Sequence, residues 1–147
     1  MREIKFRAWH KTYDLLCDVV EIVFGDDDNY VAVENGEYIE RWRFDDIELM
    51  QYTGLKDMNG VEIYEGDIVE VNIQEYVLGY YTETNYTSVV KYKNGSYYFD
   101  ISKSKTIQTD INSYPLKDAI NLEDVESDDC EVIGNKHQTP ELLEEEL

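Results

Sequence analysis

Hydrophobic and polar residues alternate in short runs along this chain, and this pattern predicts strands rather than helices. Residues 4–9 alternate residue by residue, and residues 15–24 form a second extended segment. Residues 30–33 and 37–44 flank Asn35-Gly36, the dipeptide most typical of a two-residue hairpin turn. The first third of the chain therefore predicts an antiparallel β-meander without a helix.

The stretch from residue 49 to residue 69, LMQYTGLKDMNGVEIYEGDIV, contains three turn signals between short apolar segments. Gly54 can adopt a positive φ, Asp57-Met58-Asn59-Gly60 is a tight-turn sequence, and Glu65-Gly66-Asp67 precedes a strand over residues 67–73. The turn density predicts that this stretch organises the strands on either side of it.

The second half predicts further strands with less regular connections. Residues 74–88, rich in Tyr, Thr and Gly, predict a mobile hairpin or insertion. Residues 89–92 and 96–101 flank Lys93-Asn94-Gly95, a second hairpin signal. The remaining predictions are a loop over 102–112, a helical turn or short strand over 114–120, an exposed acidic segment over 123–129, and a last strand over 130–135.

Thr139-Pro140-Glu141 has the residues that typically begin a helix, with Thr as cap and Pro at the first position. The predicted fold class is therefore all-β: an N-terminal β-meander over residues 1–53, joined to a small SH3-like β-barrel over residues 54–147 with a short C-terminal helix. A single continuous domain is the alternative. The barrel rests on analogy, because a Gly-Asp strand entry followed by a hairpin is common in such barrels.

The formal net charge is −20 over 147 residues, with 33 acidic and 13 basic side chains. Such a field repels nucleic-acid phosphates and anionic membranes. Residues 121–147 contain ten acidic residues and one Lys, a local balance of −9. No apolar run approaches the length of a membrane span, and Met1-Arg2-Glu3 does not begin a signal peptide, so we expect a soluble, cytoplasmic protein.

The acidic turn around Asp57 invites a calcium-loop interpretation, which its spacing contradicts. A calcium loop that starts at Asp57 would need an oxygen ligand at position 5, Gly at position 6 and Glu at position 12. The chain has Val61, Glu62 and Ile68 there. Turn geometry is the better explanation.

The sequence contains no recognisable catalytic, cofactor-binding or metal-binding constellation, and we expect no cofactor and no enzymatic activity. Cys17 and Cys130 are too far apart in the sequence for paired zinc thiolates, and we expect both to be reduced and structural. His10 and His137 lie near opposite ends of the chain, so a joint role would require the fold to bring them together. An enzyme with an unrecognised site is the third hypothesis for function, and a cleft with clustered, buried carboxylates would support it.

A group of basic and aromatic residues in the N-terminal part suggests a second function, nucleic-acid binding. Such a surface can bind single-stranded nucleic acid by stacking and by phosphate contacts. The alternative is that these side chains neutralise nearby acids such as Glu3 and Glu40, which the net charge favours. The group consists of Lys5, Arg7, Trp9, Arg41, Trp42 and Arg43.

Three blocks, in order, resemble the YopX-like family of small phage and prophage proteins: IKFRAWH from residue 4, LMQYTGLKDMNGVEIYEGDIV from residue 49, and EVIGNKHQTPELL from residue 131. The family often has an acidic residue where this chain has His10. The resemblance implies a β-rich fold with a barrel-like C-terminal part, encoded by a mobile element. It implies no established activity and no catalytic residues.

The leading functional hypothesis is a non-enzymatic phage or prophage accessory protein that binds a host or phage protein in the bacterial cytoplasm through an acidic surface. In one variant the acidic face imitates DNA. The alternative is a nucleic-acid-binding module that uses the Arg/Trp surface. Self-association through strand edges stays open. Turn geometry explains four side chains of the central stretch least, and these are the candidate interaction residues: Gln51, Tyr52, Lys56 and Asp57.

Overall fold

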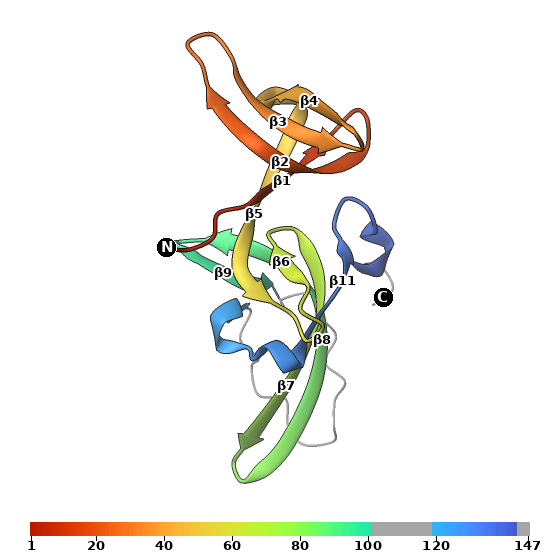
Figure 1. Ribbon diagram of the computed structural model, residues 1–147. Helices are drawn as coiled ribbons and strands as arrows, with labels where there is room; N and C mark the ends of the chain where they lie inside the picture. The colour runs from red at the N-terminus through yellow and green to blue at the C-terminus, as the bar shows by residue number, and fades with distance from the viewer. Residues whose placement is uncertain (101–118, 144–147) are drawn as a thin grey trace. The chain divides into compact units, whose positions relative to one another are not determined.

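The computed structural model of the protein describes residues 1–100 and 119–143, and most of these residues lie in strands (Figure 1). The strands form two antiparallel sheets. The chain divides into two compact units, Met1–Gly54 and Leu55–Leu147. The prediction of an all-β protein is confirmed.

The first unit is a meander of consecutive antiparallel strands. The order of its sheet is β4-β3-β2-β1-β5-β6, and β6 belongs to the second unit and follows the end of β5. Its core contains Ala8, Val31, Val33, Trp42 and Ile47, contributed by alternate positions of different strands. The elements are β1 (Phe6–His10), β2 (Leu15–Phe24), β3 (Asn29–Asn35), β4 (Tyr38–Arg43), the 3-10 turn η1 (Phe44–Asp46) and β5 (Ile47–Lys56).

The predicted Asn35-Gly36 hairpin is present between β3 and β4. Asn35 pairs with Tyr38, and Gly36 has a φ of 64°. The left-handed conformation that this turn type needs is available to glycine without a steric penalty.

The second unit holds a five-stranded sheet with the order β10-β9-β8-β7-β11. One face of this sheet carries the core, which includes Val69, Val71, Tyr86 and Phe99. The elements are β6 (Glu62–Tyr64), β7 (Asp67–Val77), β8 (Tyr80–Lys93), β9 (Ser96–Asp100), β10 (Ala119–Asn121), the 3-10 turns η2 (Leu122–Asp124) and η3 (Ser127–Asp129), β11 (Cys130–Asn135) and the 3-10 turn η4 (Pro140–Leu143).

Strands β7 and β8 form a long hairpin, seen in green in Figure 1. The pairing is continuous from Ile68 opposite Val89 to Val77 opposite Tyr80. Residues 74–88, predicted to be an irregular, mobile hairpin or insertion, therefore form a regular hairpin. In the described residues β11 pairs with β7 only as far as Val71, and β9 pairs with β8 from Val90 onward. Within the described residues, the part of the hairpin over residues 72–85 therefore pairs with neither β9 nor β11, and we call this two-stranded part the arm.

The predicted SH3-like barrel is wrong. In residues 55–100 and 119–143 the sheet is open, with β10 at one edge and β11 at the other. Closing a barrel requires tilted strands whose first and last members pair. Here β7 and β8 instead extend past their neighbours as a ribbon. A turn signal in the sequence predicts a hairpin, but it does not show whether that hairpin belongs to a closed barrel or to an open sheet.

The predicted C-terminal helix is also wrong for the described residues, where a 3-10 turn of four residues, η4, takes its place. Thr139 was expected to cap the helix, but its hydroxyl oxygen accepts a hydrogen bond from Asn135 N–H and its own N–H donates to Asn135 O. Leu142 N–H then donates to Thr139 O, which tightens the turn. The predicted loop over 102–112 and most of the segment 114–120 lie outside the described residues.

Candidate functional site

Asp57 fixes the turn that begins the second unit. Its Oδ1 accepts hydrogen bonds from Asn59 N–H and Val61 N–H, both at 2.9 Å. Its Oδ2 accepts a hydrogen bond at 2.9 Å from Val132 N–H, which lies 75 residues away in β11. The side chain is buried. Because one carboxylate satisfies three backbone donors, Asp57 ties the turn to β11.

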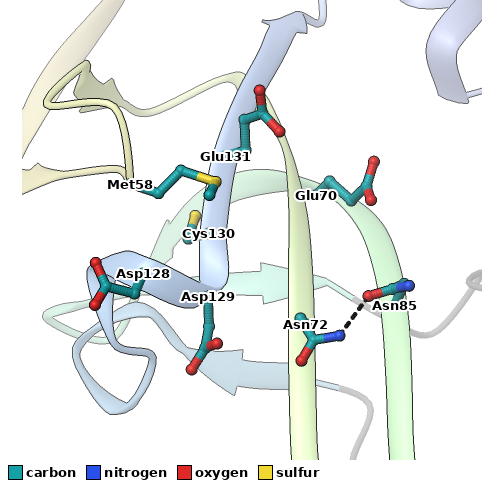
Figure 2. A pocket seen from close by; sticks show the side chains of 8 residues that line it. All are labelled: Met58, Glu70, Asn72, Asn85, Asp128, Asp129, Cys130 and Glu131. Atoms are coloured by element: carbon teal, nitrogen blue, oxygen red, sulfur yellow. Dashed lines mark hydrogen bonds between the residues drawn. The ribbon is translucent and has the colours of Figure 1, made fainter.

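A pocket lies beside this tie, lined by residues of β7, β8, β11 and η3 and by Met58 (Figure 2). Its volume is about 160 Å³. Typical small-molecule sites enclose roughly 300–1,000 Å³, so this pocket fits a single side chain better than a substrate or cofactor. The lining residues are Met58, Glu70, Asn72, Asn85, Asp128, Asp129, Cys130 and Glu131, and none of the eight is a Lys, Arg or His.

Two of the lining carboxylates are placed opposite each other by the strand register. Glu70 of β7 pairs with Glu131 of β11. Directly opposed residues on neighbouring strands have Cβ atoms roughly 4.5–5.5 Å apart, and like charges in such pairs are destabilising. Both residues are exposed. The register therefore places two carboxylate-bearing residues opposite each other among the residues that line the pocket.

The same face of the sheet continues along the arm, and we call it the open face. Val69 and Val71 point into the core, so alternate residues of β7 and their partners on β8 face away from it. Asn72 lies near the pocket, where its Nδ2 donates to Asn85 Oδ1 at 2.7 Å and to Glu83 Oε1 at 2.9 Å. The open face consists of Glu70, Asn72, Gln74 and Tyr76 on β7, of Tyr81, Glu83, Asn85 and Thr87 on β8, and of Glu131 on β11.

The amide side chains of the arm form a ladder that ends in an aromatic pair. Gln74 Nε2 donates to Asn72 Oδ1 at 3.1 Å. Farther along, the Tyr76 and Tyr81 rings meet edge to face, with centroids 5.5 Å apart and an interplanar angle of 64°. Tyr76 is 79% exposed and Tyr81 is 52% exposed. The open face thus runs from a carboxylate pair, over amides, to an exposed aromatic pair.

The cysteine at the pocket is not a reactive group. Cys130 is buried, and desolvation together with the nearby Asp57 carboxylate raises the pKa of its thiol to about 12. Burial and the carboxylates of Glu40 and Asp18 also raise the pKa of Cys17. Nucleophilic and metal-binding cysteines need a thiolate, which these environments disfavour. Within residues 1–100 and 119–143, no three His, Cys, Asp or Glu side chains are grouped so that they could hold a metal ion.

The four candidate interaction residues do not form one cluster within either unit. Tyr52 is buried in β5 of the first unit, with Lys5 Nζ 5.6 Å from its ring centroid. Gln51 is half-buried opposite Phe6. Lys56 is exposed at the start of the second unit. Asp57 is buried and has a structural role, because its carboxylate accepts three backbone hydrogen bonds.

His10 has a structural environment in the first unit. Its Nδ1 accepts hydrogen bonds from Thr12 N–H at 3.2 Å and Tyr13 N–H at 3.1 Å, and its ring stacks on Tyr13. A carboxylate oxygen can accept the same two N–H groups in a turn. The imidazole of His10 thus holds the turn that follows β1, in the way that an acidic side chain could. His137 belongs to the second unit.

The basic and aromatic residues of the first unit interact mainly with neighbours within that unit. Trp42 is 3% exposed, and its Nε1 donates to Glu40 Oε2, so its ring is not available to stack on a base. The four cations of this group have partners of their own. Lys5 pairs with Glu3 at 2.9 Å, Arg7 with Asp18 at 3.7 Å and Arg43 with Asp28 at 3.0 Å, and the Arg41 guanidinium lies over the Tyr30 ring.

Sequence reasoning missed the pocket because its residues come together only in the folded sheet. Glu70 and Glu131 are 61 positions apart, and their pairing depends on the register of β11 against β7. The acidic segment 123–129 was a partial signal of the pocket, since η3 within this segment contributes Asp128 and Asp129 to the lining.

Comparisons with known proteins found a matching family model and a similar solved structure. A family model described as YopX protein matches residues 5–144. The crystal structure of protein EF1440 from Enterococcus faecalis is similar over almost the whole of both chains, covering 97% of this chain and 99% of that chain, with 25% sequence identity and a TM-score of 0.52. No curated protein matches the sequence. In the described parts of the chain, no helix has the length and apolar character needed to cross a membrane.

Proposed function

The chain belongs to the YopX family, and from that premise we propose that it is a non-enzymatic phage or prophage accessory protein that binds a basic surface of a host or phage protein through the open face of its second unit. The observation that carries the proposal is the pair of opposed carboxylates, Glu70 and Glu131, beside a pocket without a basic residue. Like charges so placed weaken the sheet. A cationic side chain of a partner would relieve this repulsion.

The size and chemistry of the pocket support a protein partner. Its volume of about 160 Å³ suits one side chain of a partner, whereas a typical ligand site is larger. The lining offers carboxylate and amide oxygens, which accept hydrogen bonds from Lys and Arg. The net charge of −20 favours rapid, salt-sensitive association with a basic protein.

Nucleic-acid binding by the Arg/Trp surface has weaker support. The Trp42 ring is buried, and three of the four cations already have carboxylate partners. A nucleic acid would also have to approach against the net negative charge. Retention of single-stranded DNA or RNA at low salt would revive this alternative.

The test is a crosslinking capture from bacterial host lysate with the full chain as bait, repeated over a range of salt and bait concentrations. We expect saturable recovery of a basic protein that weakens as salt screens the charges. Glu70→Gln with Glu131→Gln should lower the affinity roughly two- to thirtyfold, because each exposed charge pair contributes about 0.2–1 kcal/mol.

The matched control is Glu34→Gln with Glu37→Gln, which removes the same charge from exposed positions of the first unit. This control should leave recovery nearly unchanged. Failure to recover any saturable partner would overturn the proposal. Equal loss of binding in both double variants would also overturn it, since only the overall charge would then matter.

A further inference from the structure

The proposed function leaves the arm unexplained. Within residues 1–100 and 119–143 it is a ribbon of two strands that extends past β11 and β9, and isolated two-stranded hairpins are only marginally stable in water. Apolar and aromatic side chains are nevertheless exposed at its end. Four of these are Tyr76, Leu78, Tyr80 and Tyr81, with exposed fractions between 52% and 79%.

The charge around the arm restricts what can cover its open face. Between Asp67 and Val90 the sequence has no Lys, Arg or His, and it has Glu70, Glu75 and Glu83. Desolvation, followed by the nearby Glu83, Tyr76 and Asp129, raises the pKa of the Tyr81 hydroxyl, and two of these neighbours are carboxylates. This field disfavours nucleic acid, anionic membranes and a second copy of the same face. It favours a cationic partner.

We infer that the open face binds an extended, arginine-bearing segment of the partner protein, with one guanidinium at Glu70 and Glu131 and a second stacked on the Tyr76 and Tyr81 rings. The inference rests on the proposed function and names the chemistry of its partner. A planar guanidinium forms bidentate hydrogen bonds with carboxylates and also stacks on aromatic faces, whereas a lysine ammonium is a compact and strongly hydrated charge.

The geometry sets the spacing of the two arginines. Glu70 and Tyr76 are six positions apart on the same face of one strand, which corresponds to about 20 Å at roughly 3.4 Å per residue. An extended ligand rises by nearly the same amount per residue, so arginines six positions apart reach both ends and point to the same side. The hydrogen-bonded amides between the two ends, Asn72, Gln74 and Asn85, hold the face in a fixed arrangement.

The experiment measures binding of capped seven-residue peptides to the full chain at low salt by calorimetry and by NMR shifts of the Asn72 and Asn85 side-chain amides. The first peptide has arginine at positions 1 and 7 with a Gly-Ser spacer. A second has lysine at both positions, and a third has two adjacent arginines. All three carry the same charge once their termini are blocked. We expect the first peptide to bind roughly two- to fivefold more tightly than the other two, the factor that an exposed cation–π contact of about 0.5–1 kcal/mol supplies.

Substitutions in the protein separate arginine stacking on the Tyr rings from general electrostatic attraction between the peptide and the acidic chain. Tyr76→Leu with Tyr81→Leu keeps apolar side chains but removes the aromatic faces, and it should abolish the preference for spaced arginines. The control is Tyr92→Leu, which removes the exposed ring that contacts half-buried Tyr97 at the β8–β9 hairpin and should leave the preference intact.

Equal binding of the three peptides, or a preference that survives Tyr76→Leu with Tyr81→Leu, would overturn the inference and leave the proposed function standing. A fourth peptide, with arginine at position 1 and leucine at position 7, tests for an apolar contact with the Tyr pair. Tighter binding of this peptide than of the first would show that the pair is an apolar contact rather than an arginine site, and would also overturn the inference. Absence of binding by every peptide at low salt would count against the proposed function as well.

Discussion

Replacing Asp57 should cost the second unit a large part of its stability. In Asp57→Ala three backbone N–H groups lose their acceptor. Asn59 and Val61 are exposed, so water can replace the carboxylate at a cost of roughly 0.5–1.5 kcal/mol each. Val132 is half-buried within β11, where an unsatisfied N–H costs about 1–3 kcal/mol. We expect the free energy of unfolding to fall by about 2–6 kcal/mol, out of the roughly 5–15 kcal/mol typical of a domain.

Asp57→Asn distinguishes the contributions of the two carboxylate oxygens, because it replaces only one of them. The amide oxygen can still accept from Asn59 and Val61, whereas the NH₂ group cannot accept from Val132 N–H. The expected loss is therefore smaller, about 2 kcal/mol. Lys56→Ala, at the exposed neighbouring position, is the control and should change the free energy by less than about 0.5 kcal/mol.

The assay combines urea denaturation, followed by far-ultraviolet circular dichroism, with hydrogen exchange at the Val132 amide. Both Trp residues, Trp9 and Trp42, lie in the first unit, so their fluorescence reports separately on that unit. Loss of dichroism before loss of the native fluorescence would locate the effect in the second unit. A loss below 1 kcal/mol in Asp57→Ala, or unchanged protection of the Val132 amide, would refute the structural role of Asp57.

Three further substitutions test other parts of the fold. Gly134→Ala should destabilise by about 2 kcal/mol in a urea titration, because the added Cβ would overlap Thr139 Oγ1 and lie 2.8 Å from Leu142 Cδ1; a neutral result would refute this packing. Leu78→Asn should stabilise the arm by about 1 kcal/mol and slow amide exchange there, since Leu78 has a φ of 50° that asparagine tolerates better; faster exchange would contradict this. Burial raises the pKa of Cys130 from 9.0 to about 12, so the neutral thiol is favoured in the folded state and stability should fall as pH rises from 9 towards 12. Cys130→Ala should remove that part of the pH dependence, at most about 4 kcal/mol, and identical pH profiles for both proteins would show that the thiol does not contribute.

The sequence predicted the local features of the fold because local chemistry determines them. Asn94-Gly95 forms a two-residue hairpin turn, as its dipeptide predicts. The first hairpin is also present, but its two loop residues are Gly36 and Glu37, because Asn35 already pairs with Tyr38. The β7–β8 turn escaped prediction because Leu78-Gly79 places a leucine at a left-handed position, which leucine rarely adopts.

Long-range pairing could not be predicted in the same way. Thr139 has the sequence features of a helix cap, but Asn135 at the end of β11 forms hydrogen bonds with its hydroxyl and its N–H. The barrel prediction failed because hairpin signals do not reveal whether a sheet closes. For the candidate site, the sequence indicated an acidic surface, whereas the opposition of Glu70 and Glu131 depends on a register that only the fold reveals.

The central claim is that Glu70 and Glu131 are kept at some expense to the fold because they bind a cation of the partner. The most direct measurement is a double-mutant cycle in urea at low salt, with Glu70→Gln, Glu131→Gln and the double variant. Each single substitution should stabilise the protein by about 0.2–1 kcal/mol, and the double variant should gain less than the sum, because the first substitution already removes the repulsion. Destabilisation by either substitution would show that these carboxylates support the sheet, and would contradict the claim.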